Sequence, residues 1–322
     1  NLDTIMDEFN YGIFRPEAIR DFLSFAYRSW RNPPRYVVLA GDGTFDYKNN
    51  LGYGDSLIPP LMVSTPFGLF PSDNAFVSSS EDHLPRMAIG RLPVSTPQEL
   101  QGMVDKIIAY ETALKGTWGK RALMLADIPE EGGPFNSESD SVASLLPPTY
   151  TPVRVYLGEH PLDQARRLLL NELNNGIGVM NYIGHAAVDR LSKYGLFMSG
   201  DINSLTNTGK YPVVTAMTCV VGQFAIPGYD SLAELFVLKQ KGGAIAVWAP
   251  TGISIDSEAV TLDRLYYQNA FRGRGSGSSY RFSILGDVIV KTFRDYRSGG
   301  GEPSLMDIYT LLGDPALKIR SY

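Results

Sequence analysis

The sequence has few of the residues that several common kinds of functional site require. Its 322 residues include one cysteine, Cys219, and three histidines, so an intrachain disulfide and an ordinary zinc finger are both excluded. The formal net charge of −5 at pH 7 argues against a nucleic-acid groove or a basic membrane-binding face. No apolar run reaches the roughly 18 residues of a membrane span, so we expect no transmembrane segment.

The start of the chain and its composition bear on its context. The chain begins at Asn1 with neither Met nor a basic n-region, so we expect no signal peptide in it. We also expect it to be a piece of a longer precursor, flanked there by further domains. With 44% hydrophobic and 20% charged residues, the composition is that of a globular protein that can bury a sizeable core without disulfides.

Apolar runs that alternate with helical periodicity predict an α/β fold of mostly parallel sheets flanked by helices. The expected strands are 36–40, 88–92, 121–126, 153–157, 177–183, 213–217 and 244–248, and the expected helices are 16–30, 97–114, 138–146, 161–174, 231–241, 256–271 and 283–297. Strand 36–40 has the continuous apolar run of a strand buried on both faces. Gly, Pro and Ser predict long surface loops over 47–86 and a flexible insertion at 272–281. The break at 115–119 predicts two subdomains, residues 1–118 and 119–322.

Two residues with catalytic chemistry follow neighbouring strands of the predicted sheet. His185 follows strand 177–183, and Cys219 follows strand 213–217. The carboxyl ends of parallel strands meet at one edge of the sheet, where ligands bind. A neighbouring imidazole lowers the pKa of a thiol and supplies the thiolate, so this pair predicts a cysteine hydrolase. Taken alone, each residue is more often structural, as a buried thiol or a histidine bonded to a carbonyl group.

Other polar motifs give weaker signals. Gly41-Asp42-Gly43 lacks the third glycine of a dinucleotide-binding fingerprint, because position 46 is Asp. It predicts a tight turn between a strand and a loop. The alternative is a carboxylate cluster that holds calcium together with Asp46 or Asp73. His83 and His160 are expected in an exposed loop and at an exposed helix start.

Several sequence blocks, in their order along the chain, resemble the gingipain-like cysteine peptidases of peptidase family C25. The blocks include 36–43 (YVVLAGDG), 181–185 (NYIGH), 218–224 (TCVVGQF), 242–246 (GGAIA) and 312–315 (LGDP). The resemblance implies a caspase-like α/β fold and an endopeptidase in which Cys219 is the nucleophile and His185 the general base or acid. It implies a protein or peptide substrate, no cofactor for the chemistry, and an extracytoplasmic location. It also leaves room for structural calcium, for which no ligands are assigned.

The same resemblance implies roles for residues around the dyad. Glu131 looks like the family's carboxylate beside the histidine, with Asp127 as the fallback and a solvated loop acid as the alternative for Glu131. The backbone N–H groups of Cys219 and Ala186 would bind the oxyanion. Asp140 looks like the S1 aspartate that pairs with a P1 Arg or Lys, although a carboxylate there also complements a helix dipole. The remaining residues expected to bind substrate are Thr218, Pro250 and Thr251.

One position departs from the family pattern. The family has Gly-His-Gly where this chain has Gly184-His185-Ala186. Alanine keeps the N–H but does not share the freedom of glycine to adopt positive φ. This departure motivates a second hypothesis, a catalytically impaired domain that acts as a binding or self-processing module of a larger secreted or surface protein. Self-cleavage by a basic-specific peptidase is expected at Arg272 or Arg274, in the predicted exposed loop.

Overall fold

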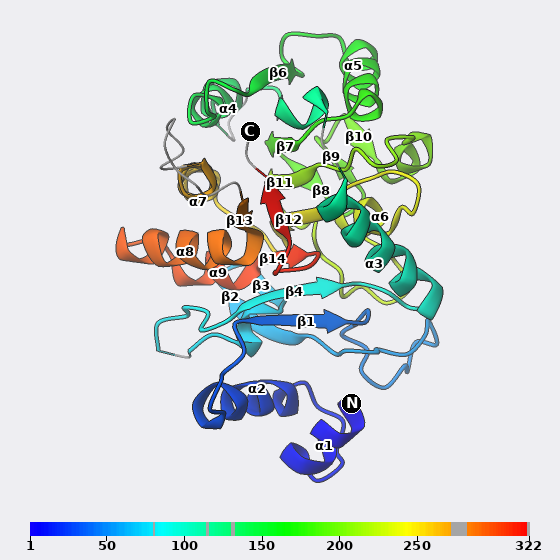
Figure 1. The fold of residues 1–322 in the computed structure, drawn as a ribbon, viewed down its shortest axis with the longest axis vertical. Helices are drawn as coiled ribbons and strands as arrows, with labels where there is room; N and C mark the ends of the chain where they lie inside the picture. The colour runs from blue at the N-terminus through cyan, green and yellow to red at the C-terminus, as the bar shows by residue number, and fades with distance from the viewer. Residues whose placement is uncertain (80, 114–115, 130–132, 272–281, 321–322) are drawn as a thin grey trace.

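The computed structural model describes residues 1–79, 81–113, 116–129, 133–271 and 282–320, which form a central sheet with helices on both faces (Figure 1). The helices are α1 (Leu2–Asn10), α2 (Glu17–Ser29), α3 (Pro97–Thr112), α4 (Phe135–Ala143), α5 (Leu162–Asn175), α6 (Leu232–Leu238), α7 (Asp256–Phe271), α8 (Leu285–Ser298) and α9 (Pro303–Ile308). The predicted loop 272–281, with Arg272 and Arg274, lies outside the described residues.

The central sheet has eight strands. In spatial order they are β1 (Tyr36–Ala40), β4 (Ala88–Leu92), β14 (Tyr309–Leu312), β12 (Ala246–Pro250), β11 (Val213–Met217), β7 (Val179–Ile183), β5 (Arg121–Ala126) and β6 (Thr151–Tyr156). Neighbouring strands pair in parallel except β12 and β14, which are antiparallel. The predicted α/β fold with a mostly parallel sheet is therefore confirmed.

Strand β14 joins the two halves of the chain. It comes from the far end of the sequence and lies between β4 and β12. The predicted boundary between residues 118 and 119 falls between α3 and β5, and strands from both sides of it belong to the same sheet. One continuous sheet thus links the N-terminal part to the strands that carry the candidate dyad.

The core forms two apolar layers, one on each face of the central strands. Helices α4, α7 and α8 cover one face, and α3, α5 and α6 cover the other. Strand β5 is buried on both faces, as its continuous apolar run predicts. The same prediction was wrong for β1, because β1 is an edge strand. Leu39 packs under α2, whereas Val38 on the opposite face is 44% exposed.

Short strands occur outside the central sheet. They form the hairpin β2 (Leu61–Thr65) and β3 (Gly68–Ser72), the small sheet β8 (Ala186–Ala187), β9 (Arg190–Leu191) and β10 (Phe197–Met198), and the pair β13 (Phe282–Ile284) and β15 (Lys318–Arg320). The expectation of loops throughout 47–86 was wrong at β2 and β3, which pair along their full length. Residues 65–67 of their turn line one cavity together with the segment 253–255, which follows β12.

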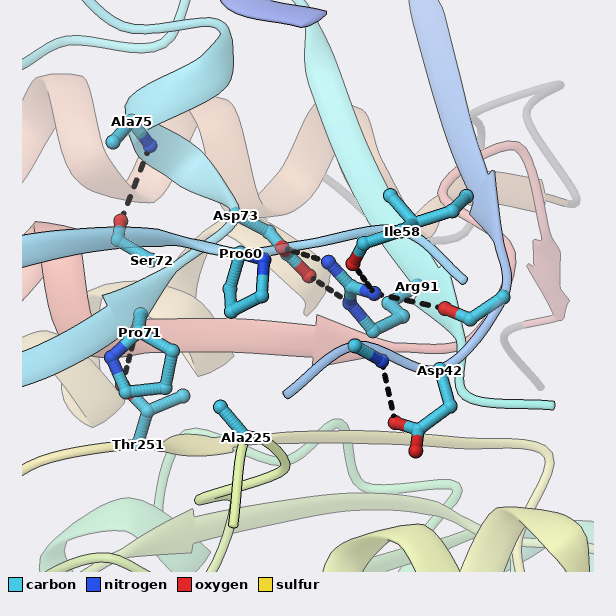
Figure 2. Close-up of polar contacts among 12 residues, drawn as sticks. Asp42, Ile58, Pro60, Pro71, Ser72, Asp73, Ala75, Arg91, Ala225 and Thr251 are labelled. Atoms are coloured by element: carbon cyan, nitrogen blue, oxygen red, sulfur yellow. Dashed lines mark hydrogen bonds and ion pairs between the residues drawn. The ribbon is translucent and has the colours of Figure 1, made fainter. Parts of the chain in front are cut away.

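A buried ion pair ties β4 to the segment after β3. The Arg91 guanidinium is fully buried and donates to both carboxylate oxygens of Asp73, at 2.8 and 2.7 Å, as Figure 2 shows. It also donates to the carbonyl oxygens of Gly41 and Ile58. The Asp46 carboxylate accepts from two backbone N–H groups of its own loop. These carboxylates are therefore engaged separately, and the alternative of a calcium cluster with Asp46 or Asp73 was wrong.

Among the residues with described coordinates, no helix combines the length and apolarity that a bilayer crossing requires. Within the same residues, no group of three or more His, Cys, Asp or Glu side chains is arranged to hold a metal ion. Structural calcium therefore stays a prediction without assigned ligands.

Candidate active site

His185 and Cys219 follow neighbouring strands at matching positions. Strands β7 and β11 pair in parallel, with Ile183 opposite Met217. His185 and Cys219 each lie two residues beyond that pair, and neighbouring strands are about 4.8 Å apart. The Gly184 N–H donates to the Met217 carbonyl oxygen at 3.3 Å, which holds the two strand ends together. The strand register thus brings the imidazole and the thiol to the same edge of the sheet.

The Cys219 thiol is partly exposed at a constrained turn. Its sulfur donates to the Ser254 carbonyl oxygen at 3.7 Å. The next residue, Val220, has φ of 46°, a left-handed conformation that a β-branched residue rarely adopts. The N–H groups of Val220 and Gly222 donate to the carbonyl oxygens of Gly252 and Pro250, both at 2.9 Å. The turn is therefore held in a strained conformation, as is common at active sites.

A buried carboxylate fixes the backbone of the histidine turn. Asp127 follows β5, and its carboxylate accepts from the backbone N–H of His185 at 3.2 Å and of Ile128 at 2.8 Å. It also accepts from the Ser192 hydroxyl at 2.8 Å. The exposed His185 ring meets the Phe135 ring edge-on, with centroids 5.4 Å apart. Asp127, the fallback for a carboxylate beside the imidazole, thus holds the His185 main chain instead.

An acidic pair that the sequence did not indicate lies near the histidine. Asp256 opens α7, Glu138 lies on α4, and their carboxyl groups are hydrogen-bonded to each other. Burial raises the pKa of Asp256, while the nearby His185 charge lowers it in part. Burial and the Asp256 charge raise the pKa of Glu138 to about 7. Both raised pKa values thus follow from placing two carboxyl groups together in a partly buried position near the imidazole.

The predicted acids of this region have different outcomes. Glu131 lies outside the described residues, so its role stays a prediction. The Asp140 carboxylate accepts from Arg154 at 2.6 Å and from the Tyr156 hydroxyl at 2.9 Å, and the bond to Arg154 lowers the pKa of Asp140. Residues two positions apart in an α-helix point about 200° apart around its axis. Glu138 and Asp140 therefore lie on nearly opposite sides of α4. Asp140 therefore faces β6, and the structure does not bring it together with the dyad.

The oxyanion candidates are backbone N–H groups. The Ser192 N–H donates to the His185 carbonyl oxygen at 2.7 Å, and in the β8–β9 pairing Ala186 lies opposite Leu191. Hydrogen-bonded and non-bonded pairs alternate in antiparallel strands, so the Ala186 N–H points away from β9. Over the described ranges, no backbone carbonyl accepts from the Cys219 N–H.

Alanine fits the backbone at position 186. In the described part of the chain, the non-glycine residues with positive φ do not include Ala186. The conformational objection raised by the departure from Gly-His-Gly therefore does not apply to this residue.

Three residues predicted to bind substrate have buried side chains. Pro250 ends β12 inside the protein, and Thr218 is 4% exposed. Thr251 is fully buried, and its hydroxyl donates to the Pro71 carbonyl oxygen at 2.6 Å (Figure 2). The structure thus places these side chains beneath the site rather than on a surface that substrate contacts. Two of them stabilise the Cys219 turn through their backbone. The Pro250 carbonyl oxygen accepts from the Gly222 N–H, and the Thr218 carbonyl oxygen accepts from the Ser254 hydroxyl.

The chain is similar in sequence to known proteins. Gingipain R2 of Porphyromonas gingivalis is 25% identical over 325 residues, which cover 94% of this chain and 40% of that protein. Lys-gingipain of the same organism is 26% identical over 168 residues, 51% of this chain and 10% of that protein. The chain thus spans less than half the length of these curated relatives.

The fold is also that of a solved structure. The crystal structure of the Arg-specific cysteine proteinase gingipain R matches with a TM-score of 0.76 at 21% identity, over 99% of this chain and 75% of that chain. The sequence profile of peptidase family C25 matches residues 1–320. The strand register, the dyad at the sheet edge and the nearly complete profile match lead to one conclusion: this chain belongs to peptidase family C25.

Proposed function

We propose that this chain is a cysteine endopeptidase that acts through Cys219 and His185. The observation that carries the proposal is the β7–β11 register, which sets both residues two positions beyond one strand pair. The partial exposure of the thiol and the exposure of the imidazole support it, because both must reach a substrate. Membership of family C25 supports the same chemistry.

The first half of the proposed reaction forms a thioester. The Cys219 thiol gives its proton to the His185 imidazole, and the thiolate sulfur attacks the carbonyl carbon of the scissile peptide. The carbonyl oxygen becomes an oxyanion, and the N–H groups of Cys219 and Ala186 donate to it. Collapse of this intermediate breaks the C–N bond. The imidazolium protonates the leaving amine, and the acyl group stays on sulfur.

The second half releases the acyl group. Water gives a proton to the His185 imidazole while its oxygen attacks the thioester carbon. The second oxyanion uses the same N–H donors and then collapses, which breaks the C–S bond and frees the new carboxylic acid. The proton returns to the Cys219 sulfur, so the enzyme ends as it began. Asp127 serves throughout as a positioning residue, because it holds the main chain of His185.

We further propose a preference for Arg or Lys at P1. The support is the acidic pair of Glu138 and Asp256, which lies near His185 and is not neutralised by an arginine or lysine in the described contacts. A cationic side chain beside this pair gains a charge-assisted hydrogen bond. Asp140 is a weaker source of such a preference, because Arg154 already pairs with it.

The context of the chain belongs to the same proposal. We propose that it works outside the cytoplasm, on a protein or peptide substrate, as part of a longer protein. The support is the similarity to gingipains, of which it covers less than half. Self-cleavage at Arg272 or Arg274 stays a prediction, tested by the intact mass of the wild type and of Cys219→Ala after prolonged incubation. Equal cleavage of both proteins would exclude it.

The proposed function is tested with fluorogenic peptides that carry Arg, Lys or a neutral residue at P1. The wild type is expected to hydrolyse the basic substrates. Cys219→Ala and His185→Ala are expected to lose at least 10³-fold in kcat, since nucleophile and base act as a unit. Lys193→Ala changes an exposed residue between β9 and β10. It serves as a control that is expected to fold and to keep the activity of the wild type. Turnover that survives Cys219→Ala would contradict the proposal.

A further inference from the structure

A cavity of about 160 Å³ lies beside the segment that follows β12. Four parts of the chain form its walls: the turn of the β2–β3 hairpin at 65–67, the segment 253–255, the first turn of α7 with Glu258, and α9 with Leu305 and Ile308. Figure 1 shows the hairpin next to α9, and the Ser72 hydroxyl donates to the Asp307 carbonyl oxygen at 2.6 Å. The cavity is therefore built from elements that are held together.

The walls expose large apolar side chains to solvent. Phe67 is 47% exposed, Ile253 40% and Ile255 53%, and all three line the cavity. Apolar groups that gather around a hollow mark a binding surface more often than isolated ones do. An apolar cavity of about 150 Å³ accommodates a benzene ring, so this one has room for a single aliphatic or aromatic side chain.

The cavity lies next to the candidate active site, with Ser254 between them. Ser254 lines the cavity, and its carbonyl oxygen accepts from the Cys219 sulfur at 3.7 Å. Its hydroxyl donates to the Thr218 carbonyl oxygen. A single residue therefore separates the nucleophile from the hollow. An extended peptide advances about 3.3 Å per residue, so a substrate residue a few positions from the scissile bond reaches it.

The order of the strands indicates which side of the scissile bond faces the cavity. β11 lies between β7 and β12 in the sheet. His185, which protonates the leaving amine, follows β7, whereas Ser254 and the cavity follow β12. The leaving amine therefore lies on the β7 side of Cys219. The acyl part of the substrate lies on the opposite side, where the cavity opens.

We propose that this cavity is a substrate subsite for a large apolar side chain, at the second to fourth residue on the N-terminal side of the scissile bond. The inference rests on the proposed peptidase function. Glu258 and Glu302 also line the cavity, and their carboxylates disfavour an acidic residue next to the apolar one. The preferred peptide thus has Leu, Ile or Phe in this subsite and no Asp or Glu beside it.

The experiment measures hydrolysis of a peptide library with one P1 residue and with P2, P3 and P4 varied in turn. We expect Leu or Phe to raise kcat/KM at least tenfold over Gly at one of these positions. Ser304→Phe, which fills the cavity from α9, is expected to remove that gain while leaving the Gly peptide unchanged. Phe67→Ser removes an apolar side chain from the cavity wall and is expected to reduce the same gain in kcat/KM. Leu69→Ser is the matched control, since Leu69 is 65% exposed on the same hairpin but does not line the cavity.

Binding of the same peptides to Cys219→Ala, measured by fluorescence anisotropy, separates this inference from the proposed function. If the wild type hydrolyses no peptide but Cys219→Ala binds the apolar peptides at least tenfold more tightly than the Gly peptide, the subsite stands and the peptidase function fails. A wild type that hydrolyses all peptides of the library at the same rate would overturn the subsite. Equal binding of apolar and Gly peptides, or Ser304→Phe and Leu69→Ser variants with the same profile, would also overturn it.

Discussion

Asp127→Asn tests how the histidine turn is held. Asp127 is 1% exposed, and each of its carboxylate oxygens accepts from one backbone N–H, Oδ1 from Ile128 and Oδ2 from His185. Backbone N–H groups cannot rotate away. An asparagine in either orientation therefore turns its NH₂ group against one of them and leaves a buried donor without an acceptor.

The magnitude follows from that lost acceptor. An unsatisfied buried donor costs about 1–3 kcal/mol, and the lost charge adds to it, so we expect a loss of about 3 kcal/mol in unfolding free energy. For a chain of this size, that corresponds to a fall of about 4 °C in Tm. Displacement of the His185 turn by about 1 Å would lower kcat/KM by about 10²-fold.

Differential scanning calorimetry and peptide hydrolysis at one pH measure the two effects of Asp127→Asn. Ser192→Ala is the matched control. It removes a hydroxyl donor to the same carboxylate and the acceptor of the Tyr194 N–H, but both Asp127 oxygens still accept from their backbone N–H groups. We expect the unfolding free energy of this control to fall by about 1 kcal/mol and its kcat/KM to stay within a few fold of the wild-type value. An Asp127→Asn variant with the Tm and kcat/KM of the wild type would refute the role assigned to Asp127.

Three further predictions concern buried or perturbed charges. Burial raises the pKa of Asp263 to about 8, so folding takes up a proton and the unfolding free energy falls as pH rises from about 4 to 8, by up to about 1.4 kcal/mol per pH unit. Asp263→Asn is expected to flatten that dependence in denaturant titrations, and an unchanged slope would contradict it. The pKa of Glu138 near 7 predicts that the ratio of kcat/KM for Arg over neutral P1 rises between pH 6 and 8 as the carboxyl ionises. Glu138→Gln is expected to make this ratio independent of pH in that range. Arg91→Met leaves the Asp73 carboxylate buried and unpaired, so we expect a loss of about 3–5 kcal/mol, measured by chemical unfolding, with part of it recovered by adding Asp73→Asn.

The regular elements could be predicted because their local pattern determines them. The helix expected at 256–271 coincides with α7, and the strand expected at 213–217 coincides with β11. The strand expected at 244–248 is displaced to Ala246–Pro250 in the structure. Proline lacks an N–H and is unusual inside a sheet. Pro250 is the last residue of the strand, and there its carbonyl oxygen accepts from the Gly222 N–H.

Features that depend on tertiary pairing could not be predicted from local pattern. The hairpin of β2 and β3 was missed because Pro and Gly around it mask the apolar alternation. Strand β14 was missed because only its place between β4 and β12 shows that it is a strand of the central sheet.

The candidate site shows the same division. His185 and Cys219 could be found because each directly follows an apolar strand, and the parallel topology then fixes their edge. The Glu138–Asp256 pair could not, because one acid lies on α4 and the other opens α7, with several strands between them in the sequence. The engagement of Asp140 by Arg154 likewise depends on how α4 packs beside β6.

The most direct test of the account is covalent labelling of the folded protein by an acyloxymethyl ketone that carries Arg, Lys or a neutral residue at P1, read by intact mass and peptide mapping. A dyad formed by the two strand ends predicts one adduct, on Cys219, that is lost in His185→Ala. Absence of an adduct on Cys219 with all three probes, in a protein that calorimetry shows to be folded, would contradict the account.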